Sequence, residues 1–480
     1  MQKKDNFFSS LLKFAIGPLG AALISFITVP VTTWLVDPEQ FGLTTMFTLL
    51  QTLITSFIYL GLDQAYVREY NNKSYRKSQL LLNASFIPLV VSGVAMIVLL
   101  LFMQPISIYL FSEVNYVLMN CLILWIPFVV IERFLLLNIR MQEKGMQYSL
   151  YNILTKIFIM ILTIGLLLYY QRTYTSIVLG MILSQMISCI ILMILSRKEL
   201  DFKNDRIDFT LIKSMLKFGL PILPSVIIVW VLNSSDRLVL NQYSTIDEIG
   251  IYFAAMKLVT ALNMIQSIFA TFWVPMAYRW HEEKVEKEQF EKVSYGVGIF
   301  MGIIFLGVLL CKKMMIMILA PEYSEAQYIV PFLLFSPIMY TMSETTTLGI
   351  AFSRKTHFNI WVSLIAAIVN LAINFALVPY IGGVGAAIGT GVAYIAFFWA
   401  RTLISRRYWY QFELKFYIIN MIILLVAATT NIIIRHPMIY LINCLFLVTY
   451  IGVNLPFINK IISLRSLADR LKNKRVKVRR

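Results

Sequence analysis

The chain has 480 residues, of which 59% are hydrophobic and only 14% are charged, and its mean hydropathy is +0.74. Soluble globular proteins are nearer half apolar with about a quarter of their residues charged, so this composition excludes a water-soluble or disordered protein. The net charge of +17 is typical of nucleic-acid-binding proteins, but membrane proteins also accumulate cations, in their cytoplasmic loops. We therefore expect an integral membrane protein that binds no nucleic acid.

Long apolar runs follow one another along nearly the whole chain. A hydrocarbon core of about 30 Å requires roughly 20 apolar residues in a helix. Runs of that kind lie near residues 14–36, 43–62, 79–103, 116–138, 149–170, 174–196, 211–240, 249–273, 293–317, 328–350, 357–379, 384–405, 414–434 and 438–459. The short alternating strands typical of membrane barrels are absent from the sequence. The sequence therefore predicts an all-α membrane protein with about fourteen transmembrane helices.

Positive charges gather at the N-terminus and in every second loop after it. The intervening loops contain little beyond Arg172 and Arg435. Because cytoplasmic loops carry such an excess, we predict a multi-pass protein of the cytoplasmic (inner) membrane with both termini in the cytoplasm. Residues 460–480 hold nine Lys and Arg, which predicts a basic tail attracted to anionic lipid.

An internal repeat relates the two halves of the chain. Lys13-Phe14 begins a run that is followed by Asp-Pro-Glu-Gln-Phe-Gly at 37–42, and Lys217-Phe218 begins a run that is followed by Ile-Asp-Glu-Ile-Gly at 246–250. Repeats separated by an even number of spans share one orientation, which predicts a parallel six-plus-six duplication. The predicted parts are an N-lobe at 1–205, a C-lobe at 206–408, a helix pair at 409–459 and the basic tail at 460–480.

A polar stripe follows the second span. Its members recur at steps of three and four residues, so they share one helical face. They are Thr44, Thr48, Thr52, Thr55, Tyr59 and Asp63. Single Thr residues in membrane helices commonly bond to a neighbouring helix. Six positions that end in a carboxylate favour a water-lined face.

Other spans carry charged and amide side chains, which are costly in hydrocarbon and usually face a cavity or a partner. They are Glu132, Arg133, Asn152, Lys156, Asn233, Asp236, Arg237, Lys257, Glu344, Asn370 and Asn374. Their spread over both halves at several depths is what a translocation pathway requires. Alternatively, Arg237 and Lys257 snorkel to the interface, as we expect of Lys312, and the adjacent acid–base pairs bond to neighbouring helices.

Catalytic signatures are absent from the sequence. It contains no phosphate-binding GxxxxGK[ST] loop, and its three His show no metal-ligand spacing. The predicted outer loops are too short for a glycosyl-transfer or ligase site. We therefore expect a transporter without a cofactor or metal, not an enzyme.

Several stretches resemble the polysaccharide-export flippases. They are Gly61-Leu-Asp-Gln-Ala-Tyr-Val-Arg68, Gly219-Leu-Pro221, Asp236-Arg237, Ile249-Gly-Ile-Tyr252, Asn370-Leu-Ala-Ile-Asn374 and Gly382-Gly-Val-Gly-Ala-Ala-Ile-Gly-Thr390. On them the chain is identified as a member of the multidrug/oligosaccharidyl-lipid/polysaccharide exporter superfamily, in its O-antigen and capsule repeat-unit branch. The resemblance implies two six-helix lobes in a V, and export of an undecaprenyl-pyrophosphate-linked oligosaccharide.

Roles for the polar residues follow from this resemblance. Arg133 and Lys156 would receive the pyrophosphate, and Arg237 and Lys257 would hold it after the lobes rock outward. The sugar hydroxyls would bond to Thr48, Thr52, Thr55, Tyr59, Asn152, Asn233, Asn370 and Asn374. Coupling to an ion or proton would use Asp63, Glu344 or Asp236.

Three rival functions remain open at this point. A drug or cation antiporter on the same scaffold should have a net acidic, aromatic pocket. A membrane polysaccharide polymerase or ligase should carry a large outer loop. A non-transporting scaffold for glycan polymerase and assembly proteins needs no polar stripes. The sequence favours the flippase, whose partners would be the lipid-linked oligosaccharide, membrane lipids and glycan-assembly proteins.

Overall fold

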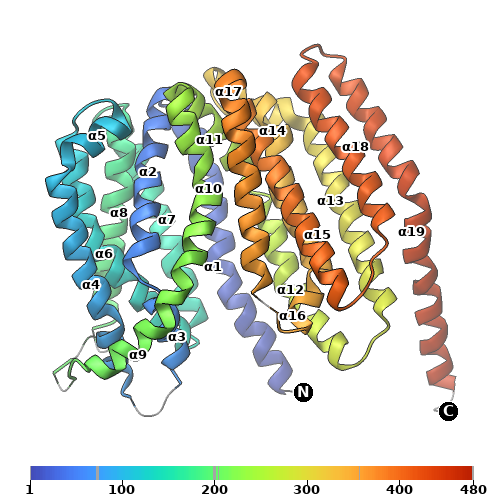
Figure 1. Cartoon of the computed structure of the whole chain (residues 1–480), viewed down its shortest axis with the longest axis horizontal. Coiled ribbons are helices and arrows are strands. Elements are labelled where there is room, and N and C mark those ends of the chain that lie inside the picture. Colours follow the sequence, from blue (N-terminus) through green and yellow to red (C-terminus); the bar gives the residue numbers. More distant parts are fainter. Residues whose placement is uncertain are drawn as a thin grey trace. The chain divides into compact units, whose positions relative to one another are not determined.

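The computed structural model is all-helical over the residues that it describes (Figure 1). These are residues 2–71, 75–197, 200, 202–203, 205–355 and 357–477, with side chains described only from 16 to 461. The chain divides into two compact units, Met1–Asn241 with Thr245–Ala254, and Gln242–Ser244 with Ala255–Arg480. Each unit is described by itself.

The first unit contains ten α-helices and the start of an eleventh within the described residues. They are α1 (Gln2–Thr33), α2 (Pro38–Ile58), α3 (Leu62–Glu69), α4 (Lys77–Leu101), α5 (Met103–Phe111), α6 (Tyr116–Met141), α7 (Gly145–Tyr169), α8 (Tyr174–Leu195), α9 (Phe209–Gly219), α10 (Leu223–Tyr243) and the first half of α11 (Ile246–Thr260). The helices α9 and α10 pack within this unit, although the repeat assigns them to the second half of the sequence.

The second unit continues from α11. Its helices are α12 (Asn263–Glu282), α13 (Lys287–Ile316), α14 (Ala326–Leu333), α15 (Phe335–Thr346), α16 (Leu348–Phe352), α17 (Phe358–Tyr408), α18 (Leu414–Ile433) and α19 (Ile439–Lys477). The predicted basic tail at 460–480 falls almost entirely outside the described side chains.

Twelve helices in the described residues are long and apolar enough to cross a membrane. One of them, α17, has 51 residues, and its backbone leaves the helical region at Ile381 and Gly382. The side chains of Asn370 and Thr390 lie 3.4 Å apart across that point, so the chain reverses there and α17 forms two antiparallel spans. A further apolar run is broken at Leu334 into α14 and α15. The prediction of about fourteen membrane helices in an all-α fold is therefore confirmed.

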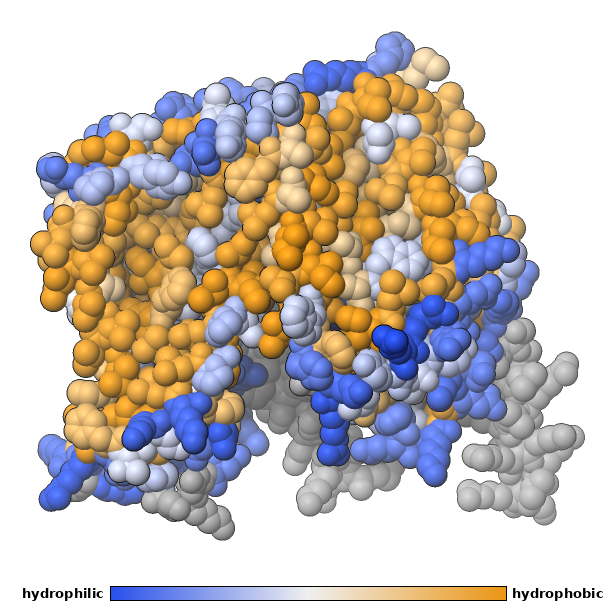
Figure 2. Space-filling view, in the orientation of Figure 1, coloured by the Kyte–Doolittle hydropathy of each residue, from blue (hydrophilic) through white to orange (hydrophobic). Residues whose placement is uncertain are grey.

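Hydrophobic and hydrophilic residues are distributed over the surface as in a membrane protein. Figure 2 shows hydrophobic residues along the middle of the helices and hydrophilic residues at their ends. Large apolar side chains such as Val94, Leu101 and Leu445 are exposed. Exposed apolar surface on this scale needs lipid to cover it. The chain is a multi-pass membrane protein.

Glycines allow close helix packing at matching places in the two repeats. A Cβ on Gly180 of α8 would lie 2.7 Å from the Cα of Thr163 on α7. A Cβ on Gly389 would lie 2.1 Å from the Asn374 Oδ1 atom in the other half of α17. Small residues let membrane helices approach in this way. Both glycines lie near the start of the sixth span of the predicted repeats.

Both ends of α2 contact segments that the repeat assigns to the second half. Near its start, a Cβ on Gly42 would lie 2.2 Å from the Ile246 carbonyl oxygen, and one on Gly250 would lie 1.9 Å from the Pro38 carbonyl oxygen. Just after its end, Gly61 has a φ of +72° and packs directly on Gly219. These backbone contacts hold α2 beside α10 and the start of α11.

The two C-terminal helices are joined by paired asparagines. Asn420 and Asn454 exchange hydrogen bonds of 3.2 and 2.7 Å, and Asn431 and Asn443 exchange bonds of 2.7 and 3.1 Å. Beside them, Lys312 is only 1% exposed and donates to the Asn431 carbonyl at 3.3 Å. The expectation that Lys312 snorkels is wrong, because α13, α14 and α18 enclose its ammonium group and give it a carbonyl acceptor.

Candidate functional site

A cavity of about 490 Å³ is lined by residues of α2 and α10, two helices of the first unit. It brings together residues far apart in the chain. The lining residues are Thr52, Thr55, Ser56, Ser225, Val226, Val229, Trp230, Asn233, Ser234 and Arg237. Six of these ten carry a hydroxyl or amide group, one is aromatic and one is cationic. The cavity therefore offers hydrogen bonds, one flat apolar ring and one positive charge.

The hydroxyls on α2 are already partly committed to the helix backbone. Thr52 donates to the Leu49 carbonyl at 2.8 Å, and Thr55 donates to the carbonyls of Gln51 and Thr52 at 3.1 Å. A hydroxyl that donates to its own helix still has free lone pairs with which to accept. Each Thr therefore presents an acceptor to the cavity, which suits a ligand rich in O–H donors.

Arg237 is the positive charge of this cavity. Its Nη1 atom lies 3.5 Å from the Thr48 hydroxyl, and its guanidinium carbon lies 4.3 Å from the ring centre of Phe253. Its Nε atom is buried without a hydrogen-bond partner. Among the described residues, no carboxylate oxygen lies within 4 Å of it. Most of the donors of this guanidinium are therefore free to bind an anion.

Asp236, the residue before Arg237, is directed toward α11 and not toward the cavity. Asp236 is buried and accepts a hydrogen bond from the Tyr252 hydroxyl on α11. The two adjacent charges thus diverge, the carboxylate into the packing between α10 and α11 and the guanidinium toward α2. This divergence leaves the cavity cationic.

A second polar cluster joins α3 and α6. Arg133 donates from Nη2 to the Asp63 carboxylate at 2.6 Å, and its guanidinium lies 5.7 Å from the ring centre of Tyr59. The side chain of Asp63 is 10% exposed and that of Arg133 is 41% exposed. The predicted pyrophosphate ligand and the predicted coupling carboxylate are therefore paired with each other.

The charge next to Arg133 faces the interior of the unit. Glu132 is 7% exposed and accepts hydrogen bonds from the Tyr151 hydroxyl at 2.7 Å and the Gln185 amide at 2.6 Å. Lys156, one helix away on α7, interacts electrostatically with Glu132. On the same helix, Asn152 donates to the Tyr148 carbonyl at 2.7 Å. These groups form a network among α6, α7 and α8, separate from the lining of the α2–α10 cavity.

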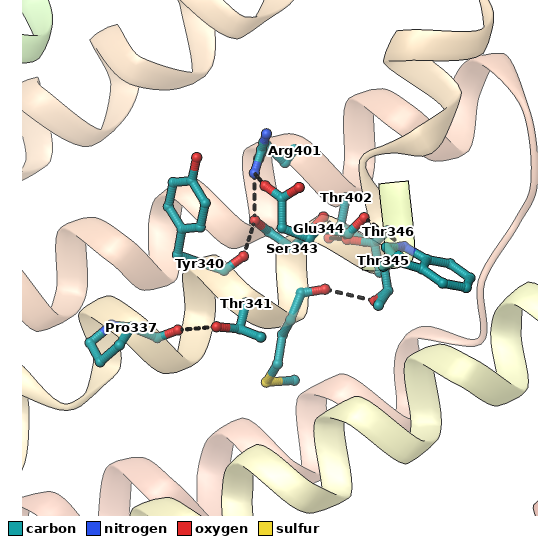
Figure 3. Close-up of polar contacts among 11 residues, drawn as sticks. Pro337, Tyr340, Thr341, Ser343, Glu344, Thr345, Thr346, Arg401 and Thr402 are labelled. Carbon is teal, nitrogen blue, oxygen red and sulfur yellow. Dashed lines mark hydrogen bonds and ion pairs between the residues drawn. The ribbon is translucent and has the colours of Figure 1, made fainter. Parts of the chain in front are cut away.

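In the second unit, Glu344 of α15 pairs with Arg401 of α17. The Arg401 Nη1 atom donates to the Glu344 carboxylate at 2.9 Å and to the Ser343 hydroxyl at 2.8 Å (Figure 3). The two side chains are 13% and 12% exposed. The rings of Tyr340 and Phe397 lie 5.3 and 5.0 Å from the guanidinium. Glu344 is thus one half of a buried ion pair.

The remaining predicted residues lie apart from the α2–α10 cavity. Lys257 is exposed on α11, beyond the boundary of the first unit. Asn370 and Asn374 are buried and bonded to each other at 3.2 Å where the two parts of α17 pack. Neither asparagine lines this cavity.

Several residues of these sites were not anticipated from the sequence. Trp230, Ser225 and Ser56 line the cavity, but a lone Trp or Ser in a membrane helix carries no periodic signal. Arg401 lies near the end of its apolar run, where the sequence gives no reason to expect a buried charge. It pairs with Glu344, which lies 57 residues earlier in the chain, and no local sequence pattern reveals a contact over that separation. In the described part of the chain, no group of three His, Cys, Asp or Glu residues could hold a metal.

The whole chain shares its fold with a known flippase. The structure titled lipid II flippase MurJ, inward closed conformation, superposes with a TM-score of 0.71 over 95% of this chain and 99% of that one, at 15% identity. MATE in complex with MaL6 gives 0.50 at 13% identity, covering 83% and 94%. A MOP superfamily transporter from Pyrococcus furiosus Vc1 gives 0.49 at 14% identity, covering 83% and 96%.

Residues 11–281 match the family described as polysaccharide biosynthesis protein. This match spans more than half of the chain, which therefore belongs to that family. The predicted membership of a polysaccharide-related family is thereby confirmed, and the likeness to the lipid II flippase confirms the predicted fold. No curated protein sequence matches the chain.

Proposed function

We propose that this protein is a flippase that moves an undecaprenyl-pyrophosphate-linked oligosaccharide across the cytoplasmic membrane, with both of its termini in the cytoplasm. It would serve the assembly of O-antigen, capsule or another exopolysaccharide, beside glycan polymerase and assembly proteins. The observation that carries the proposal is the α2–α10 cavity, which combines hydroxyls, amides and Trp230 with the guanidinium of Arg237.

The chemistry of this substrate matches that lining. A pyrophosphate carries about two negative charges, so its passage through hydrocarbon requires a compensating cation. Arginine binds phosphate oxygens through several N–H donors at once. Sugar hydroxyls both donate and accept, as Thr, Ser and Asn side chains do, and the ring of Trp230 offers a flat surface to a pyranose.

The other predicted residues have distinct proposed roles. Arg133 and Lys156 would meet the pyrophosphate first, and Lys257 would follow Arg237 when the N-lobe and C-lobe alternate. Asp63, Asp236 and Glu344 stay the proposed coupling groups. Each is already bonded to a donor, to Arg133, Tyr252 and Arg401 respectively, so protonation of the carboxylate would release that donor.

A drug antiporter is the main rival function. Its pocket should be acidic, whereas no carboxylate lines this cavity. Transport of a cation such as ethidium, without transport of a lipid-linked glycan, would favour the antiporter over the flippase. Hydrolysis or transfer of a glycan by the purified protein would instead indicate an enzyme.

The test is a flipping assay with the purified full-length protein in liposomes. We expect wild type to move a fluorescent polyprenyl-pyrophosphate-linked glycan between leaflets, and Arg237→Ala to lower the rate at least tenfold. Arg237→Lys should recover part of the rate, because the charge remains but the planar array of donors is lost. Arg172→Ala, at an exposed arginine between α7 and α8, is the matched control.

Two results would contradict the assignment of Arg237. Wild-type flipping by both Arg237→Ala and Lys156→Ala would show that these cations do not bind the substrate. Equal losses in Arg237→Ala and Arg172→Ala would reflect a general defect in charge or folding.

A further inference from the structure

A second cavity of about 490 Å³ adjoins the first along α2 and α10. It is a groove, bounded on its other side by α4 and α5. Its lining residues are Leu49, Leu50, Leu53, Val98, Phe102, Pro105, Ile106, Tyr109, Leu110, Trp230 and Leu238. Only the Tyr109 hydroxyl and the Trp230 indole nitrogen contribute polar side-chain atoms. The groove is therefore almost purely hydrocarbon, in contrast to the cavity beside it.

Consecutive residues divide between the two cavities. On α10, Arg237 lines the polar cavity and Leu238 lines the groove. On α2, Thr52 lines the cavity and Leu53 lines the groove. Successive residues on a helix point about 100° apart, so the two cavities occupy neighbouring faces of both helices. One pair of helices thus presents a phosphate-binding surface next to a hydrocarbon surface.

Trp230 is the residue that the two cavities share. Its indole Nε1 atom lies 3.3 Å from the Thr52 hydroxyl, which is part of the polar lining. The same side chain also lines the groove, together with Leu and Val residues. A side chain with a hydrogen-bonding edge and a large apolar body suits the boundary between a polar and an apolar compartment.

We infer that this groove holds the polyprenyl chain of the carrier lipid, in the isoprene units that follow the pyrophosphate. The inference rests on the proposed function, because the pyrophosphate must lie at Arg237 for the chain to enter the groove past Leu238 and Trp230. The α2–α10 contact then separates headgroup from chain, and Trp230 marks the position of the phosphoester that joins the pyrophosphate to the first isoprene unit.

The connection between headgroup and chain explains why the groove would select this lipid. Lipid tails are as apolar as Leu, so a groove facing the bilayer gains only packing energy from an acyl chain. A chain tethered to a headgroup already bound at Arg237 has a high effective concentration in the groove. A free phospholipid lacks that advantage. The groove would therefore recognise a chain joined to a pyrophosphate and not acyl chains in general.

Photolabelling of the full-length protein in lipid nanodiscs tests this inference. The probe is a polyprenyl pyrophosphate with a diazirine in its first isoprene units, and labelled residues are identified by peptide mass spectrometry. We expect label on groove residues such as Leu53, Val98 and Phe102. Unlabelled polyprenyl pyrophosphate should displace it, whereas the uncharged polyprenol should not.

A matched pair of variants sharpens the test. Val98→Phe adds bulk inside the groove, and Val94→Phe makes the same change one turn earlier on α4, at an exposed position outside the groove. We expect Val98→Phe to lower labelling at least tenfold and Val94→Phe to leave it unchanged. Binding of a soluble pyrophosphate-linked sugar without a polyprenyl chain should be the same in both variants. The melting temperature of each variant reports whether it folds.

Each remaining outcome is decisive. Saturable binding with label only at lipid-facing positions such as Leu101 would overturn the chain site and leave the proposed function intact. Label in the groove that phospholipid displaces as well as polyprenyl pyrophosphate does would mean occupancy by bulk lipid only. The absence of saturable binding of any polyprenyl pyrophosphate would overturn both proposals.

Discussion

Two carboxylates, Glu132 in the first unit and Glu344 in the second, lie on the fourth span of the predicted repeats. Each bonds to a residue of the sixth span of its own repeat, Glu132 to Gln185 and Glu344 to Arg401. The partners differ in charge. Glu132 is satisfied by neutral donors, Gln185 and Tyr151, whereas Glu344 faces a guanidinium.

The two predicted repeats thus share a carboxylate on the fourth span that bonds to the sixth span, but the charge of its partner differs, and so does the free energy of the interaction. Neutral donors stabilise a carboxylate without requiring another buried charge. A buried ion pair binds more strongly, but removal of either partner leaves an uncompensated charge. We therefore expect the second unit to depend on its pair more than the first unit depends on its network.

The largest effect should come from Arg401→Ala. It removes the cation from Glu344 at a site where both side chains are nearly buried, and loss of one partner of such a pair typically costs about 3–5 kcal/mol. Thermal unfolding in detergent, monitored by size-exclusion chromatography, would measure the loss. The double variant Arg401→Leu with Glu344→Met should be more stable than the single one, and an unchanged melting temperature for Arg401→Ala would contradict the ion-pair account.

The same substitution in both units tests the comparison directly. Glu344→Gln removes the counter-ion of a nearly buried guanidinium and should cost about 1.5–3 kcal/mol, the range for hydrogen bonds to charged groups. Glu132→Gln keeps an acceptor for Tyr151, and it removes a charge that acts on Lys156 without forming an ion pair with it. A smaller loss of about 1 kcal/mol is therefore expected. Equal losses in the two variants, measured by the same unfolding assay, would show that the charge of the partner is irrelevant.

The matching glycines provide a third comparison. Gly180→Ala brings a methyl group against the backbone of Thr163, whereas Gly389→Ala meets the side chain of Asn374. Both changes overpack a helix contact, which costs about 1–3 kcal/mol, and Gly180→Ala should be the worse because backbone yields less than a side chain. Denaturation midpoints of the two variants would rank them. The reverse order would mean that the buried amide of Asn374 is the more rigid neighbour.

The smallest effect concerns pH. The hydrogen bond from Lys460 holds the pKa of Glu413, just before α18, below its usual range, with Tyr295 as a second donor. The ionised form thus stabilises the fold at neutral pH, and this stabilisation is lost as the pH falls through the lowered pKa. Lys460→Met should lower the melting temperature slightly at pH 7 and by less under acid conditions. A pH-independent difference would exclude this linkage.

The membrane-spanning helices could be predicted from the sequence because the length of an apolar run is a local property, which a window of roughly twenty residues contains in full. The predicted repeat rests on a local feature as well, since the sequence segments before Gly42 and Gly250 are alike. The sequence patterns also selected Thr52, Thr55, Asn233 and Arg237, which the fold brings to one cavity.

Contacts between residues far apart in the sequence could not be predicted from local patterns. Nothing local shows that Arg133 meets Asp63, or that the hydroxyl of Tyr151 meets Glu132. Burial was also misjudged where a charge lies near a span end, as at Lys312 and Arg401. In both cases the tertiary fold supplies an acceptor, which makes snorkelling unnecessary.

The contact at the start of α2 has a consequence for the ancestry of the chain. Pro38 and Ile246 occupy the same place in the repeat, as do Gly42 and Gly250. The two contacts, Gly42 on Ile246 and Gly250 on Pro38, are therefore one contact made twice. Subunits of a twofold-symmetric dimer meet in this reciprocal way. Fusion of two copies of a half-length gene, whose product assembled as a homodimer through this surface, would leave such a mark.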